Sequence, residues 1–306
     1  MRGVLGAFIT IWAVTAAGWV IGRTGLLGAG AETVLARLAF FVAAPALLLT
    51  TLAAADLAQV FTPVLVAFVT STVVVALVYL GLARAFWRRT AGETAIGTLC
   101  AAYVNAGNLG IPVAAYALGD VAYIAPVLLF QLLVATPLAM AVLEVDRDGR
   151  VGLARLAMSP LRNPITVGSA AGIALAATGW LPPPEVMRPI ELTGSAAVPL
   201  ALIVLGMSLA GTPPRLTGAD SGQRATAVTL KVLVQPVVAY AAGRYLLGLS
   251  GTPLLAATII SGLPTAQNIY VYASRYGRGE TLARDSIVLS TLVAVGSLLA
   301  IAAWLS

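Results

Sequence analysis

The chain has 306 residues, of which 59% are hydrophobic and 10% are charged, and its mean hydropathy is +0.95. Water-soluble domains carry far more charge, so the composition excludes an ordinary soluble protein and indicates a chain dissolved mainly in lipid. The net charge of +6 does not indicate a nucleic-acid partner, because the basic residues lie in short loops between apolar segments.

Ten apolar segments are long enough to cross a bilayer. The first follows Arg2 and is too long for the apolar core of a signal peptide, so we interpret it as a transmembrane helix. The predicted spans are 4–22, 32–53, 63–83, 94–118, 121–143, 164–181, 187–210, 224–247, 252–275 and 282–304.

The basic residues alternate between the two ends of these spans. Fourteen of the 18 fall in or beside the loops that follow the odd-numbered spans, three fall on the other side, and Lys231 lies inside the eighth span. By the positive-inside rule the first set is cytoplasmic, which places both termini outside. We therefore predict a multi-pass membrane protein with extracytoplasmic termini. One lysine against 17 arginines is typical of a GC-rich bacterial genome, which suggests a bacterial cytoplasmic (inner) membrane.

The two halves of the chain repeat each other. Pro45 in the second span matches Pro199 in the seventh, and Pro112 in the fourth matches Pro264 in the ninth. Each half contains five of the ten spans. Because five is odd, the second half must enter the membrane from the opposite side, as in the inverted repeats of many secondary transporters. The predicted organisation is a first five-helix repeat, a cytoplasmic linker and a second repeat, at 1–143, 144–162 and 163–306.

The fourth and ninth spans carry the residues best suited to bind a ligand. Residues 105–112 read NAGNLGIP and residues 261–268 read SGLPTAQN, so both spans combine helix-breaking Gly and Pro with side-chain amides. At such a break the freed N–H groups suit an anion and the freed carbonyls suit a cation. The alternative is that Gly and Pro only serve packing, since both are common in membrane helices.

Other polar residues inside spans leave two interpretations open. Gln131 is either substrate-facing or bonded to another helix, and Lys231 either snorkels to the headgroups or attracts an anion. Structural roles are favoured for a further set: the Pro45 and Pro199 pair as kink or packing sites, Gly168, Ser169 and Gly172 as close helix contacts, Ser290 and Thr291 as hydrogen-bonding groups, and Cys100 as a packed apolar residue.

Several kinds of chemistry have no support in the sequence. The chain has one cysteine and no histidine, so it can form no intrachain disulfide and lacks the usual metal ligand. No P-loop, HExxH motif or nucleophile–base pair is present, so we predict no enzyme activity, no metal site and no cofactor. No Asp or Glu lies near the middle of a span, which disfavours a proton relay and favours uniport.

The order and spacing of several motifs resemble the auxin efflux carrier family, the bacterial branch more than the plant PIN carriers. The motifs are NAGNLGIP at 105–112, RNP at 162–164, PLALIVLGMSL at 199–209, LPTAQN at 263–268 and ASRY at 273–276. Two plant features are missing: the long cytoplasmic loop, and the charged pair in the third span, since 63–83 carry no charge. These departures weigh against auxin itself, and the expected substrate is a small carboxylate such as malonate, malate or an auxin-like acid.

The resemblance implies an all-α fold similar to sodium/proton antiporters and bile-acid symporters, with two inverted repeats and broken fourth and ninth helices that cross. It also implies an elevator in which the first, second, sixth and seventh helices form the scaffold, and an organic-anion substrate such as malonate or malate. A sodium-coupled symporter, a non-transporting membrane sensor and a homodimer remain open. The predicted substrate-binding residues are Asn105, Asn108, Gly110, Pro112, Gln131, Pro264, Gln267 and Asn268.

Overall fold

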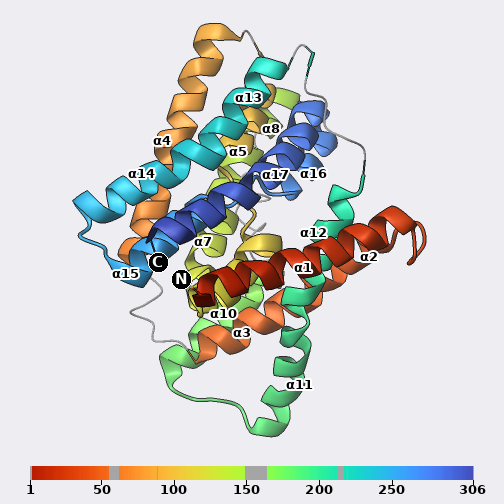
Figure 1. The fold of residues 1–306 in the computed structure, drawn as a ribbon, viewed down its shortest axis with the longest axis vertical. Coiled ribbons are helices and arrows are strands. Elements are labelled where there is room, and N and C mark those ends of the chain that lie inside the picture. The colour runs from red at the N-terminus through yellow and green to blue at the C-terminus, as the bar shows by residue number, and fades with distance from the viewer. Residues whose placement is uncertain are drawn as a thin grey trace. The chain divides into compact units, whose positions relative to one another are not determined.

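The computed structural model describes residues 2–54, 62–87, 89–148, 164–211, 217–218 and 220–305. Every regular element in these ranges is a helix, and one isolated β-bridge joins two non-helical segments. Most of the predicted linker 144–162 lies outside the described residues, as do Arg162 and Asn163 of the RNP motif. The helices, shown in Figure 1, fall into two compact units, and each unit draws on both halves of the sequence.

The first unit contains the helices of four predicted spans together with the second part of the fourth span and the beginning of the fifth. Its elements are α1 (Arg2–Thr24), α2 (Ala31–Leu38), η1 (Ala39–Ala43), α3 (Ala44–Ala53), η3 (Ala106–Gly110), α6 (Ile111–Val113), η4 (Ala114–Leu118), η5 (Val121–Tyr123), α7 (Ala125–Phe130), α10 (Pro164–Thr178), α11 (Pro184–Ser195) and α12 (Ala197–Leu209). The four predicted spans are the first, second, sixth and seventh.

Glycines set the closest helix contacts of this unit. A Cβ atom on Gly206 of α12 would lie 2.0 Å from the carbonyl oxygen of Thr15 in α1, and one on Gly18 of α1 would lie 2.3 Å from that of Ile203. The predicted close contacts of the sixth span are confirmed, since Gly168 and Gly172 of α10 lie directly against the α3 backbone. The hydrophobic effect does not draw helices together in lipid, so close backbone packing at small residues holds these helices in contact.

The second unit holds the remaining helices. Its elements are α4 (Pro63–Phe86), α5 (Ala91–Ala102), α8 (Thr136–Asp148), α13 (Ser221–Thr229), η8 (Leu230–Val234), α14 (Gln235–Ala241), η9 (Ala242–Leu246), α15 (Gly251–Ser261), α16 (Asn268–Tyr276) and α17 (Glu280–Leu305). The short η6 (Gln131–Ala135) is divided between the units, with Gln131 in the first.

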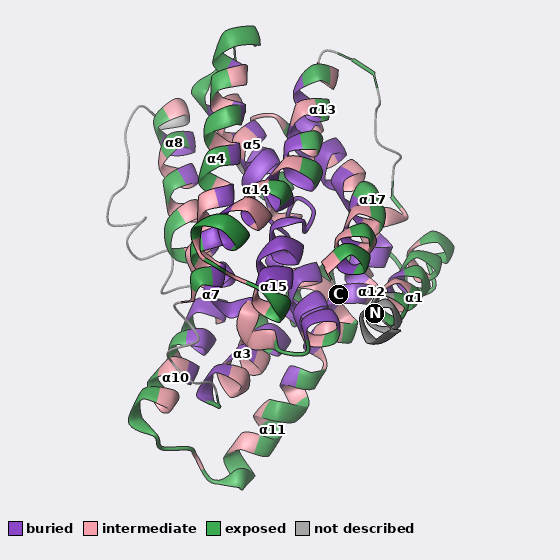
Figure 2. Ribbon diagram, turned by 60° about the vertical axis from the view of Figure 1, so that its left-hand side comes forward, coloured by how far each residue is buried: buried purple, intermediate pink, exposed green. Residues whose placement is uncertain are grey.

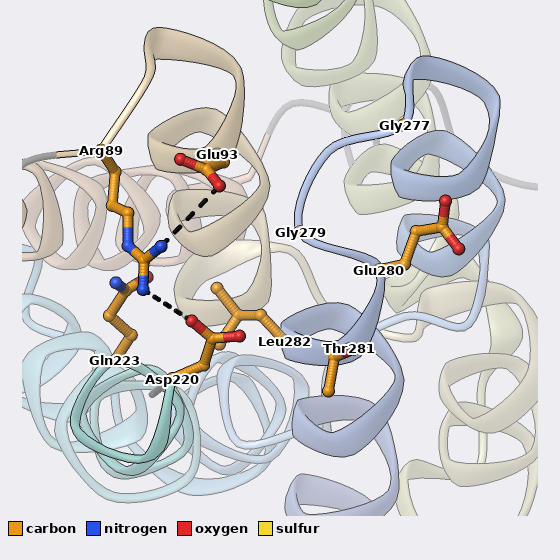
Figure 3. Close-up of a pocket in the computed structure, with 9 residues that line it drawn as sticks. All are labelled: Arg89, Glu93, Asp220, Gln223, Gly277, Gly279, Glu280, Thr281 and Leu282. Atoms are coloured by element: carbon orange, nitrogen blue, oxygen red, sulfur yellow. Dashed lines mark hydrogen bonds and ion pairs between the residues drawn. The ribbon is translucent and has the colours of Figure 1, made fainter. Parts of the chain in front are cut away.

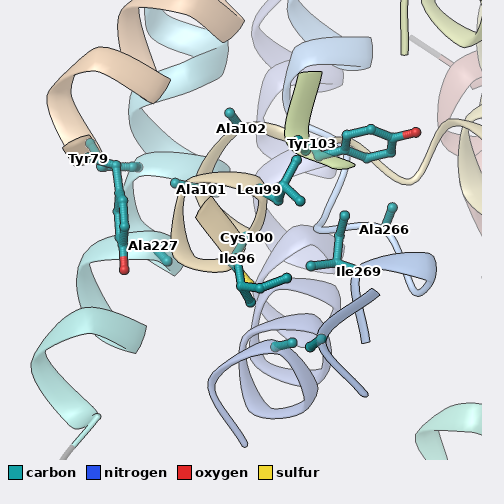
Figure 4. Close-up of a cluster of buried hydrophobic side chains, with 14 of the residues drawn as sticks. Tyr79, Ile96, Leu99, Cys100, Ala101, Ala102, Tyr103, Ala227, Ala266 and Ile269 are labelled. Carbon is teal, nitrogen blue, oxygen red and sulfur yellow. The ribbon is translucent and has the colours of Figure 1, made fainter. Parts of the chain in front are cut away.

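The core of the second unit forms around α5. Cys100, Ala101 and Ile96 are fully buried there and belong to one apolar cluster with Ile269 of α16 (Figure 4). Cys100 is therefore a packed apolar residue, as predicted. Outward faces are apolar as well: Leu77 of α4 is 62% exposed, and exposed residues run along the outer surfaces of the helices in Figure 2. Exposed aliphatic faces of this extent fit a lipid environment.

Six described helical stretches are long and apolar enough to cross a membrane. They are Ala31–Ala53, Pro63–Phe86, Val121–Asp146, Pro184–Leu209, Ser221–Leu246 and Glu280–Leu305. Three shorter apolar helices, Ala106–Leu118, Pro164–Thr178 and Gly251–Ser261, lie within other predicted spans. The full count of ten and the inverted repeats stay predictions. The boundaries of the predicted repeats differ from those of the compact units. This difference does not test the repeats, because a sequence repeat need not fold into a compact unit by itself.

Candidate functional site

The predicted fourth helix is interrupted where the NAGNLGIP segment begins. The helix α5 begins at a capping box, in which the Thr90 side chain accepts from the Glu93 N–H and the Glu93 carboxylate accepts from the Thr90 N–H. It ends at Tyr103, which is extended with φ −90° and ψ 112°. The helical path resumes at Ala106, so three residues, 103–105, form the break.

The predicted ninth helix is interrupted at the expected place. Here α15 ends at Ser261, and α16 begins at Asn268. Pro264 within this gap has no N–H to donate and excludes a continuous helix. The segment 261–266 is buried throughout, so its backbone groups need partners inside the protein.

The two breaks supply these partners to each other. The Asn105 N–H donates to the Pro264 carbonyl at 2.8 Å, and the Ala266 N–H donates to the Tyr103 carbonyl at 3.2 Å. Val104 and Thr265 form an antiparallel β-bridge between these two bonds. We call residues 103–105 together with 264–266 the crossover.

Thr265 braces the crossover from both sides. Its hydroxyl donates to the Cys100 carbonyl at 2.6 Å, in the last turn of α5, and its N–H donates to the Ser290 hydroxyl of α17 at 3.1 Å. Ser290 in turn donates to the Ile287 carbonyl, and the Thr291 hydroxyl donates to the same carbonyl. The structural interpretation of Ser290 and Thr291 therefore agrees with their contacts.

Polar side chains gather where α16 leaves the crossover. The Asn268 amide donates to the Tyr272 hydroxyl at 3.1 Å, and the Tyr103 and Thr136 hydroxyls are 3.0 Å apart. None of these four groups carries a formal charge at neutral pH, so the cluster can hold an anion by hydrogen bonds without repelling it.

Lys231 occupies the interior of this unit. It is fully buried, and its ammonium donates to the Gln235 side-chain carbonyl and, at 3.0 Å, to the Ser261 carbonyl. Snorkelling to the headgroups, one of the two interpretations of this residue, is therefore wrong: the side chain turns into the protein, where helix-end carbonyls accept its protons. Gln235 extends the connection, since its amide donates to the Ala102 carbonyl at 3.3 Å and to the Thr72 hydroxyl at 3.1 Å.

The predicted site residues fall into two sets. The second unit brings Asn105, Pro264, Gln267 and Asn268 together at the crossover, with Asn105 buried and Gln267 and Asn268 half-buried. The first unit contains the other set: Asn108 and Gly110 in η3, Pro112 in α6 and Gln131 at the start of η6. In this set Gly110, Pro112 and Gln131 are buried, and Asn108 is half-buried.

A pocket of about 400 Å³ lies elsewhere in the second unit (Figure 3). Arg89 reaches from its rim to Asp220 at 2.8 Å and lies 3.9 Å from Glu93, while Glu280 adds a third carboxylate. The acidic side chains outnumber the single arginine, so this pocket suits a small anion poorly. Within the described residues no group of three or more Cys, Asp or Glu side chains is arranged to hold a metal ion.

Three supporting residues were not predicted from the sequence. Thr265, Gln235 and Tyr103 hold the crossover and the adjacent helix end together, yet none of them was singled out among the candidate residues. Thr265 lies between two predicted site residues, and Gln235 precedes a proline one turn after Lys231. These positions could have drawn attention to Thr265 and Gln235. Their hydrogen-bond partners are distant in the sequence, however, so the sequence alone did not show their roles.

Comparison with known proteins supports a role in transport. A family model described as "Membrane transport protein" matches residues 4–147 and 150–302, and the division between the two stretches falls within the predicted linker. A protein of Rhizobium meliloti (strain 1021) named "Putative malonate transporter" is 31% identical over 240 residues, which cover 74% of this chain and 72% of that protein.

Proposed function

Because the chain belongs to the membrane transport protein family, the auxin efflux carrier family that its motifs resemble, we propose that it is a secondary transporter of a small carboxylate. The observation that carries the proposal is the pairing of two broken helices at Asn105 and Pro264, with the amide of Asn268 one turn away. Interrupted helices of this kind form the substrate sites of many transporters.

The chemistry of the crossover favours an anion. The half-helix α16 begins at Asn268, and the amide groups at its start carry the positive end of the helix dipole. The side-chain amides of Asn105 and Asn268 would add neutral donors. The roles of Asn108, Gly110, Pro112 and Gln131, which belong to the first unit, stay predictions from the sequence. The similarity to the Rhizobium meliloti protein makes malonate the first substrate to test.

We infer an elevator mechanism with uniport. The unit that contains α1, α3, α10 and α12 would act as scaffold, and the unit that contains the crossover would carry the substrate. Uniport is supported by the crossover carbonyls of Tyr103 and Pro264, which already accept hydrogen bonds from backbone amides. A carboxylate that moves alone carries net charge, so an inside-positive membrane potential would drive its uptake.

The test is uptake of radiolabelled malonate and malate into proteoliposomes, with sodium or choline outside and with or without an imposed potential. Uptake that follows the potential in both salts is the expected result. Uptake only with sodium would replace uniport by the sodium-coupled alternative. Saturable binding of malonate without flux in any condition would instead identify a non-transporting sensor.

A further inference from the structure

Lys231 is a buried lysine whose side-chain nitrogen has no carboxylate partner in the part of the chain that the structure describes. It has no exposed surface, and among the described residues no Asp or Glu lies within ion-pair distance of its ammonium. An uncompensated charge inside a membrane protein is costly and marks a functional position by default. The compensation must come from groups other than carboxylates.

Two helix ends provide that compensation. The ammonium donates directly to the Ser261 carbonyl, at the C-terminal end of α15. Through Gln235 it connects to the Ala102 carbonyl, at the C-terminal end of α5. The C-terminal end of a helix carries roughly half an elementary negative charge, so two such ends together roughly balance one ammonium.

Three carbonyls at these helix ends already accept hydrogen bonds. Cys100 accepts from the Thr265 hydroxyl, Ala102 from Gln235, and Ser261 from Lys231. A sodium ion would have to displace these donors and lie beside an ammonium, which repels it. The ends of α5 and α15 would otherwise favour a bound cation. The side chain of Lys231 occupies that position instead.

We infer that Lys231 is the built-in cation of the crossover: its ammonium takes the electrostatic role of a coupling ion and makes transport independent of sodium. Lys231 is thus a positioning residue, which acts through the ends of α5 and α15 rather than by touching the substrate. The inference rests on the proposed function, since it explains why that function needs no sodium.

The charge of Lys231 can be observed without any substrate. It is the only lysine of the chain, so lysine labelled with nitrogen-15 at Nζ gives one side-chain signal in the purified protein. We expect an ammonium carrying three protons near neutral pH, with a signal that stays unchanged when sodium replaces choline. A neutral amine, or a signal that shifts with sodium, would overturn the inference even if transport were demonstrated.

Transport by a variant provides the second test. Lys231→Met keeps the length and volume of the side chain but leaves both helix ends uncompensated. We expect its malonate uptake in choline to fall on the order of tenfold or more, the effect of removing one unit charge from a poorly screened site. Sodium should restore part of this uptake, whereas wild type should behave alike in both salts.

Leu233→Met is the matched control, because Leu233 lies in the same η8 segment and is 53% exposed. It should transport like wild type in both salts. A Lys231→Met protein that elutes as a folded species but equals wild type in choline, or gains no sodium response, would contradict the inference. If wild type moves no malonate at all, the proposed substrate fails, while the nitrogen-15 spectrum still decides the state of Lys231.

Discussion

The backbone N–H of Asn105 donates a 2.8 Å hydrogen bond to the carbonyl of Pro264, and this bond joins the two interrupted helices of the second unit. Both residues are buried, so neither group could find water in its place. The bond places the backbone of Asn105 beside Pro264, four residues before Asn268, where α16 begins. It therefore fixes the geometry on which the proposed site depends.

The side-chain amides of Asn105 and Asn268 are predicted to carry substrate binding. Each alanine variant, Asn105→Ala and Asn268→Ala, should lower malonate uptake at least about tenfold, because one hydrogen bond to a charged group is worth roughly 1.5–3 kcal/mol. Uptake into proteoliposomes at matched protein content measures this. The control is Thr252→Ala, at an exposed position of α15. Normal uptake by both asparagine variants would refute the site.

The Thr265 hydroxyl is predicted to stabilise the crossover. In Thr265→Val the side chain keeps its shape but the Cys100 carbonyl loses the donor that lies at 2.6 Å. Leaving a buried acceptor unsatisfied costs about 1–3 kcal/mol of the free energy of unfolding. A thermal melt of the detergent-solubilised protein should show a lower midpoint. Thr265→Ser retains the hydroxyl and should melt closer to wild type, and equal melting of all three proteins would argue against the brace.

The contact of α1 with α12 is predicted to tolerate no side chain at Gly206. The added Cβ of Gly206→Ala would lie 2.0 Å from the Thr15 carbonyl oxygen, so the helices must separate. We expect a loss of about 1–3 kcal/mol, as for overpacked interiors. The control is Gly296→Ala in α17, where no atom lies within 4 Å of the new Cβ. That variant should be neutral or slightly more stable because alanine favours the helix.

Two aspartates are predicted to differ in their contribution to stability. Asp285 is fully buried between Arg284 at 2.8 Å and Arg224 at 3.5 Å, so Asp285→Asn leaves uncompensated positive charge inside the protein. This should cost about 3–5 kcal/mol. Asp146 is itself partly exposed and bonds the more exposed Arg278 at 2.7 Å, and Asp146→Asn should cost at most about 1 kcal/mol. Unfolding measured side by side tests the difference, which similar losses would contradict.

Much of the site could be predicted because its signal is local. Pro264 has no N–H to donate, so the interruption of the ninth helix was predictable from residues 261–268 alone. In the fourth helix the break precedes the Gly and Pro residues that suggested it: Gly107, Gly110 and Pro112 lie within the helical stretch Ala106–Leu118. The break in the fourth helix falls at 103–105, at the start of the predicted segment, because Asn105 bonds to Pro264 instead of to its own helix. Lys231 was harder, since a lysine two turns inside a span can either snorkel or turn inward.

The sequence by itself determined that the chain is a membrane protein, which family it belongs to and which two helices are interrupted. These follow from apolar content, motif order and backbone chemistry, each of which acts over a few residues. Only the tertiary structure decided which groups satisfy the freed carbonyls: Thr265 for Cys100, Gln235 for Ala102 and Lys231 for Ser261. A buried carbonyl accepts whichever donor the packing of distant helices brings within 3 Å or so, and sequence spacing does not encode that proximity.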